Sequence, residues 1–167
     1  MKILIIGRAR HGKTTTATAL RKQLTKKDFK VGNYATSQFL IHRLSEVLHV
    51  PLKQIEDNKN EYRPRLIELG NLLCDLDPGI LASICLFTSK KANDDVAIVD
   101  GVRRKNEYDR VKEYFDLILY VERKIDTIKD NFELDHVKDI ASTIYLENDG
   151  TQEDLENKIS QIIENLK

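Results

Sequence analysis

The feature that most constrains this chain is the segment Gly7-Arg-Ala-Arg-His-Gly12-Lys13-Thr14, which follows the apolar run from Lys2 to Ile6. It fits the pattern G-x-x-x-x-G-K-S/T in full. Glycines in such a loop let backbone N–H groups point inward at phosphate oxygens, and the helix that follows adds its positive end. The Lys charge suits the β- and γ-phosphates, and the Thr hydroxyl suits Mg²⁺. The segment therefore predicts an ATP and Mg²⁺ site lined by Gly7, Arg10, His11, Gly12, Lys13, Thr14 and Thr15. At His11, a variable position, we expect the backbone to matter more than the side chain.

Length and composition limit the kind of protein. The 167 residues are 41% hydrophobic and 32% charged, which is typical of one globular domain. The 27 basic and 27 acidic side chains balance, so no net charge favours nucleic acid or a membrane surface. Cys74 and Cys85 lack the spacing of a disulfide framework or a zinc site, so we expect buried thiols. These features predict a single-domain cytoplasmic protein with no membrane or nucleic-acid partner.

Apolar patterning predicts strands that alternate with helices. Such alternation favours right-handed βαβ units around a parallel sheet covered on both faces. The expected fold is therefore α/β, with three α/β/α layers and a five-stranded parallel sheet. We expect strands at 2–6, 29–34, 96–99, 117–121 and 143–146. We expect helices at 12–27, 37–50, 64–76, 77–88 and 106–114, and a closing helix after 151, with caps at Ser37, Asp77 and Thr151.

A second candidate site feature is Val96-Ala-Ile-Val-Asp100-Gly101-Val-Arg103-Arg104, where an acidic residue ends an apolar strand. Open α/β folds bind ligands at the carboxyl edge of the sheet. We therefore expect Asp100 to hold Mg²⁺ through water, together with Thr14. The fork-shaped donors of Arg103 and Arg104 suit an acceptor phosphate, although ordinary surface arginines at a helix start are the alternative.

Two further basic segments are informative mainly through their positions. Tyr62-Arg63-Pro64-Arg65-Leu-Ile-Glu-Leu-Gly70 lies between the second and third expected strands, within a helical insert at about 36–88 that we expect to bind the acceptor. The segment from Arg123, at about 123–140, follows a strand. It is expected to form a short lid that excludes water from the phosphates, or else a solvated charged helix.

Together these motifs resemble the nucleoside monophosphate kinase superfamily, and most closely the deoxynucleoside monophosphate kinases of bacteriophages. The resemblance runs almost end to end and includes the C-terminal Leu146-Glu-Asn148-Asp-Gly150-Thr-Gln-Glu-Asp-Leu155. It implies that Asn148 and Gly150 lie near the adenine of ATP and that Arg123 belongs to the lid. For the acceptor it implies Phe39, Arg43, Arg63, Arg65, Gly70, Arg103 and Arg104. The motifs and the resemblance together give Lys13, Arg63, Asp100, Arg103 and Arg104 as the expected catalytic residues.

The same motifs are similar to those of animal-type phosphomevalonate kinases. The sequence also departs from typical adenylate kinases, because Asp100-Gly-Val-Arg-Arg104 replaces their Asp-Gly-Phe-Pro-Arg and the lid is short. The expected reaction is transfer from Mg-ATP to a (deoxy)nucleoside monophosphate, in a phage-like context. A kinase for a non-nucleotide phosphorylated metabolite and a non-catalytic nucleotide-binding switch stay open as alternatives, as does a homodimer.

Overall fold

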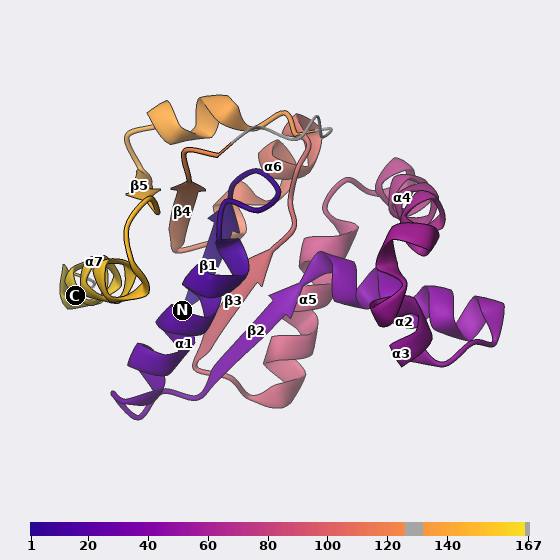
Figure 1. Ribbon diagram of the computed structural model, residues 1–167, viewed down its shortest axis with the longest axis horizontal. Helices are drawn as coiled ribbons and strands as arrows, with labels where there is room; N and C mark the ends of the chain where they lie inside the picture. The colour runs from indigo at the N-terminus through magenta and orange to yellow at the C-terminus, as the bar shows by residue number, and fades with distance from the viewer. Residues whose placement is uncertain (126–131, 166–167) are drawn as a thin grey trace.

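The computed structural model describes residues 1–125 and 132–165. Five strands form one sheet in the order β2-β3-β1-β4-β5, and every neighbouring pair is parallel (Figure 1). The expected α/β fold with a five-stranded parallel sheet is confirmed. The strands are β1 (Lys2–Ile6), β2 (Val31–Ala35), β3 (Val96–Asp100), β4 (Leu117–Glu122) and β5 (Thr143–Glu147).

Helices cover both faces of this sheet. Because successive side chains of a strand point to opposite faces, the continuous apolar run of β1 contributes apolar side chains to the core on both faces of the sheet. Ile3 and Ile5 pack on the face covered by α1 and α7, whereas Leu4 and Ile6 pack on the face covered by α5, α6 and η2. The helices are α1 (Lys13–Thr25), α2 (Thr36–Leu48), α3 (Leu52–Asp57), α4 (Lys59–Leu76), α5 (Ile80–Ala92), α6 (Lys105–Val111), η1 (Lys112–Tyr114), η2 (Asp135–Asp139) and α7 (Gln152–Asn165).

The helices α2, α3 and α4 lie to one side of the sheet, beyond β2 (Figure 1). They enclose a separate apolar cluster, and a side-chain Cβ at Gly70 of α4 would come 3.3 Å from Leu40 Cδ1 of α2. Gly70 therefore permits the close approach of these two helices. The buried members of this third cluster are Ile41, Leu44, Ile55, Tyr62 and Leu66.

The expected starts of β2 and α2 were both wrong. Phe29 is not part of β2: it is 43% exposed, and its N–H bonds to the carbonyl of Leu24 (3.2 Å) in the turn that ends α1. Ser37 does not cap α2, because β2 runs directly into the helix and Ala35 stands at the cap position without a side-chain bond. The short helix α3 was not predicted, because its six residues contain too few apolar positions for a helical period.

The long helix α4 begins at Lys59 and not at Pro64, so the proline lies inside it. A proline there removes one backbone bond, to the carbonyl four residues earlier. The first turn is nevertheless helical, because it places Tyr62 among the buried side chains of the third cluster. Tertiary packing outweighs the local signal.

The helix α5 begins at Ile80 and not at Asp77. The Asp77 carboxylate accepts a hydrogen bond from the Gly79 N–H (2.9 Å), and its carbonyl accepts one from the Ile80 N–H (3.0 Å), so this segment is a turn between α4 and α5. The expected cap at Thr151 is present. Its hydroxyl accepts from the Asp154 N–H (3.2 Å), while Asp154 Oδ2 accepts from the Thr151 N–H (2.8 Å).

Residues 126–131 of the expected lid lie outside the described residues. Within residues 1–125 and 132–165, no single helix is both long and apolar enough to span a membrane. By length and composition, α4 and α5 meet that test only as a pair, with 89° between them.

Both cysteines are free and buried, as expected. Burial raises the pKa of the Cys85 thiol to about 12, with a contribution from the charge of Asp100. Burial and the contact with Glu107 raise the pKa of Cys74 to about 12. Since the thiolate is the nucleophile, we expect both thiols to react with a disulfide reagent at pH 8 at least about 10²-fold more slowly in the folded protein than in guanidinium. Equal rates in the two states would contradict this burial.

Candidate functional site

The loop between β1 and α1 has the backbone that its glycines predict. Gly7 and Gly12 have positive φ angles of 154° and 96°, which side-chain-bearing residues rarely adopt. A Cβ at Gly7 would lie 2.3 Å from the Val121 carbonyl oxygen, and one at Gly12 would lie 2.1 Å from Asn148 Nδ2. Both positions therefore require glycine. Lys13 Nζ donates to the carbonyls of Gly7 (2.8 Å) and Arg8 (2.9 Å), so its ammonium lies across the mouth of the loop.

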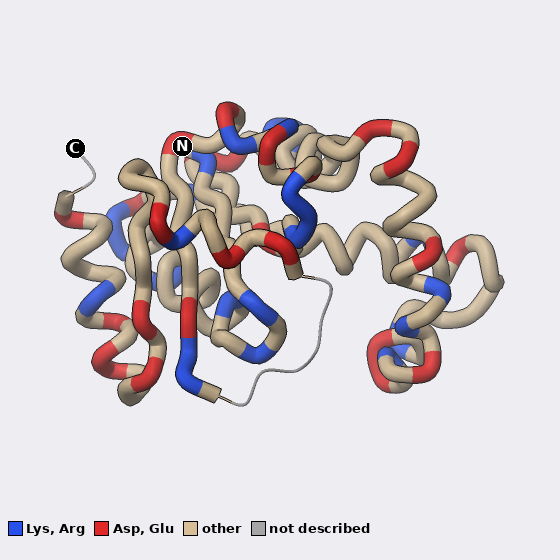
Figure 2. Tube along the Cα trace, turned by 90° about the horizontal axis from the view of Figure 1, so that it is seen from above, with Lys and Arg blue, Asp and Glu red and all other residues tan. Residues whose placement is uncertain are grey.

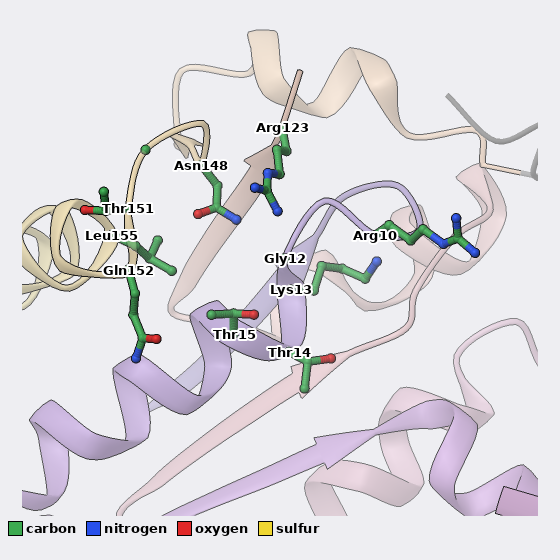
Figure 3. Close-up of a pocket in the computed structure, with 11 residues that line it drawn as sticks. Arg10, Gly12, Lys13, Thr14, Thr15, Arg123, Asn148, Thr151, Gln152 and Leu155 are labelled. Atoms are coloured by element: carbon green, nitrogen blue, oxygen red, sulfur yellow. The ribbon is translucent and has the colours of Figure 1, made fainter. Parts of the chain in front are cut away.

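A cavity of about 430 Å³ opens beside this loop (Figure 3). Figure 3 shows Lys13, Thr14 and Thr15 on one wall and Asn148, Thr151 and Leu155 on the opposite wall. The structure thus brings together segments that are more than 100 residues apart. The predicted residues among its lining are Arg10, Gly12, Lys13, Thr14, Thr15, Arg123, Asn148 and Gly150.

Three lining residues were missed: Thr151, Gln152 and Leu155. They lie at the start of α7, directly after the segment around Asn148 and Gly150. The sequence signal for that helix start, the Thr151 cap, was recognised. Nothing in the sequence indicated that the first turn of α7 would face the loop after β1, because that contact depends on the place of β5 in the sheet.

His11 is held by its side chain as well as by its backbone, which differs from the expectation for this position. The residue is only 3% exposed. Its Nδ1 accepts the Arg123 backbone N–H (3.2 Å), and its carbonyl accepts a bond from Asn148 Nδ2 (3.0 Å). His11 therefore connects the loop both to the chain after β4 and to the chain after β5.

Asp100 stands at the carboxyl edge of the sheet, beside the loop. In the sheet register it is paired with Ile5 of β1 and Ala35 of β2. Burial raises the pKa of Asp100, while the charges of Lys13, Arg103 and Lys59 oppose that rise. The positive charges of these three side chains therefore all act on the Asp100 carboxylate. Lys59 was missed, because in the sequence it is one polar residue in a polar stretch.

The oxygen donors at this edge fit a Mg²⁺ ion that is bound together with a nucleotide. The Thr14 hydroxyl and the Asp100 carboxylate are hard oxygen ligands, which Mg²⁺ prefers. Among the residues that the structure describes, no three His, Cys, Asp or Glu side chains gather to hold a metal by themselves. That donor set suits an ion that takes its other ligands from phosphate and water.

The residues expected to bind the acceptor do not converge on one cavity. Arg43 stacks on Phe39 (5.2 Å from guanidinium carbon to ring centroid) and pairs with Glu46 (2.6 Å) on α2. Arg104 contacts Asn71 of α4 and lies 4.0 Å from Glu107, so it joins α6 to α4. Arg63 and Arg65 are exposed on α4.

Figure 2 views the carboxyl edge of the sheet from above. Over most of the described chain, Lys and Arg are interleaved with Asp and Glu (Figure 2). The loop after β1 differs, because residues 7–13 include three basic side chains and no acidic one. The local charge favours an anionic ligand at this loop.

The parallel sheet, the glycine loop with its lysine and the cavity beside it define an α/β protein of the P-loop type. The sequence matches no model of a protein family, and no curated protein matches it. Among solved structures, the chain is similar to the shikimate kinase from Aquifex aeolicus, with 17% identity over 98% of this chain and 96% of that chain and a TM-score of 0.50. It is also similar to TT1252 from Thermus thermophilus, with 16% identity over 100% and 98% of the two chains and a TM-score of 0.55. The chain therefore has the fold of a P-loop kinase.

Proposed function

We propose that this chain is an ATP-dependent kinase that uses Mg²⁺ and transfers a phosphoryl group to a (deoxy)nucleoside monophosphate. The observation that supports this proposal most is the cavity of about 430 Å³ whose one wall is the loop with Lys13 and Thr14. A cavity of this size accommodates a bound small molecule. The opposite wall, at residues 148–155, is proposed to receive the base of ATP, and it includes the polar residues Thr151 and Gln152 and the apolar residue Leu155.

The acceptor is proposed to lie on the other side of the loop, near Asp100 and towards the helices α2 to α4. The charges of Lys13, Arg103 and Lys59 act together at Asp100, so this edge favours an acceptor that carries a phosphate. The oxygen of a phosphate acceptor is already ionised at neutral pH. In-line transfer to it needs positioning and charge stabilisation more than a general base.

In this proposal each residue of the loop has a defined task. Lys13 and the loop N–H groups stabilise negative charge on the transferring phosphoryl group. Thr14 and, through water, Asp100 would hold Mg²⁺, which when bound neutralises charge on the β- and γ-phosphates. The carbonyls of Gly7 and Arg8, which accept from Lys13 Nζ, set the place of its ammonium before the nucleotide binds.

The test is coupled ADP release from Mg-ATP with purified protein and a panel of acceptors. The panel contains the four dNMPs, the NMPs, hydroxymethylated dNMPs, phosphomevalonate and shikimate, the last because a shikimate kinase shares the fold. We expect turnover with one or a few dNMPs and none with the Lys13→Ala variant, which controls for contaminating kinases. Turnover with phosphomevalonate or shikimate alone would replace the nucleotide acceptor by a metabolite. ATP binding without transfer to any acceptor would favour a nucleotide-binding switch.

A further inference from the structure

An ion pair joins the loop after β1 to a distant segment of the chain. Arg8 Nε donates to Asp135 Oδ1 (3.1 Å), and its Nη2 contacts Oδ2 of the same carboxylate, so the pair is bidentate. The Tyr120 hydroxyl donates to Asp135 Oδ1 as well (2.9 Å), and its side chain is fully buried. The Arg8 guanidinium also lies 5.4 Å from the centroid of the Phe132 ring. Bidentate pairs of this kind fix orientation more strongly than single contacts.

The backbone of Arg8 is in direct contact with the lysine of the loop. Its carbonyl oxygen accepts from Lys13 Nζ at 2.9 Å, beside the Gly7 carbonyl at 2.8 Å. Gly7 has a positive φ of 154°, and glycine leaves the backbone a wide choice of conformations. A contact that fixes the Arg8 side chain therefore also restricts where the two carbonyls, and with them the ammonium, can lie.

We infer that Asp135 and Arg8 are positioning residues, which hold the loop so that the Lys13 ammonium is placed for the β- and γ-phosphates. The inference rests on the proposed function, since it assigns the pair a task in nucleotide binding. Asp135 reaches the loop from η2, 127 residues along the chain from Arg8. Tyr120, on β4, orients the carboxylate from the sheet.

The alternative is that the pair only fastens η2 to the domain, and the chain contains a matched control for it. Lys138, on the same η2, pairs with Glu122 of β4 (3.2 Å). That bond anchors the same element to the same strand through a carboxylate other than Asp135. Asp135→Asn and Lys138→Gln therefore separate an effect on the loop from an effect on η2.

Two measurements on the full chain test the inference. The first is amide hydrogen exchange of peptides covering residues 7–14 without nucleotide. The second is calorimetric titration with Mg-ATP and, separately, with adenosine, which lacks the β- and γ-phosphates that Lys13 addresses. For Asp135→Asn we expect about 3- to 10-fold faster exchange of the loop and about 10-fold weaker Mg-ATP binding, with adenosine binding unchanged. For Lys138→Gln we expect changes below about 2-fold in the exchange of the loop and in the binding of both ligands.

Equal changes in Asp135→Asn and Lys138→Gln, or none in either, would overturn the inference. If Asp135→Asn does not fold, Tyr120→Phe removes one hydrogen bond without changing the shape of the side chain. That variant should shift loop exchange in the same direction by about 2-fold, and an unshifted loop would overturn the inference. If the unchanged protein does not bind Mg-ATP, the proposed function is wrong. In that case the hydrogen exchange of the loop still tests whether the Arg8–Asp135 pair positions the loop.

Discussion

A protein with Lys13 replaced by alanine is expected to keep its fold and to transfer phosphate at least about 10³-fold more slowly than the unchanged protein. The ammonium is the positive group that lies across the mouth of the loop, held at 2.8 and 2.9 Å from the carbonyls of Gly7 and Arg8. It would stabilise charge that develops on the transferring group, and no neutral side chain replaces it. The rate is measured by coupled ADP release with the acceptor found in the panel, and the fold by circular dichroism and thermal unfolding.

The matched control for Lys13 is on the same helix. Lys22 of α1 pairs with Glu156 of α7 at 3.0 Å, and neither residue lines the cavity. Lys22→Ala removes the same kind of side chain and a surface ion pair, which is worth about 1 kcal/mol or less. We expect its turnover to stay within about 2-fold of the unchanged protein. Near-normal turnover in Lys13→Ala would contradict the proposed mechanism.

Replacing Asp100 by asparagine is expected to lower turnover by about 10²-fold or more and, at the same time, to raise the temperature of unfolding. Turnover falls because the carboxylate would no longer help to hold Mg²⁺. Stability rises because burial raises the pKa of Asp100 despite the nearby charges of Lys13, Arg103 and Lys59, so that the ionised carboxylate destabilises the fold at neutral pH. Asparagine has nearly the same size and no charge.

The pH dependence of this gain in stability checks its cause. The pKa of Asp100 is higher in the folded protein than the value of about 3.9 expected in the unfolded chain. Below the unfolded value both states are protonated and the penalty is absent; it grows as the pH rises from the unfolded pKa to the folded pKa and is constant above that. The difference in unfolding temperature between Asp100→Asn and the unchanged protein should therefore be larger at pH 7 than at pH 4. A variant that unfolds earlier at pH 7 would show that the carboxylate stabilises the fold.

The strands and the loop were predictable because their signals are local. A fully apolar run such as Val96–Val99 predicts a strand buried on both faces, and the glycines at 7 and 12 specify their own backbone angles. The same is true of the Thr151 cap. The order of the strands in the sheet was not predictable, because it depends on which strands pair at long range.

The errors and omissions come from contacts between distant segments. The start of α4 depends on Tyr62 packing among Ile55 and Leu66, and this outweighs the proline signal at Pro64. His11 and Arg8 occupy variable positions of the loop, so the pattern gives their side chains no task. Their partners, Arg123 and Asp135, lie 112 and 127 residues away. Such pairs become visible only when the fold is known.

The helices α2, α3 and α4 have an apolar cluster of their own, apart from the two clusters that flank the sheet. A unit with its own core can turn as a rigid body, because the packing within it does not have to be broken for it to move. Its covalent connections to the rest of the domain are the junction of β2 and α2 and the turn at Asp77 and Pro78. Side-chain contacts of Arg104 with Asn71 and of Glu107 with Cys74 also join α6 to α4. The two junctions are therefore the natural hinges, and a rotation about them has to break the contacts between α6 and α4 but none of the packing inside the unit.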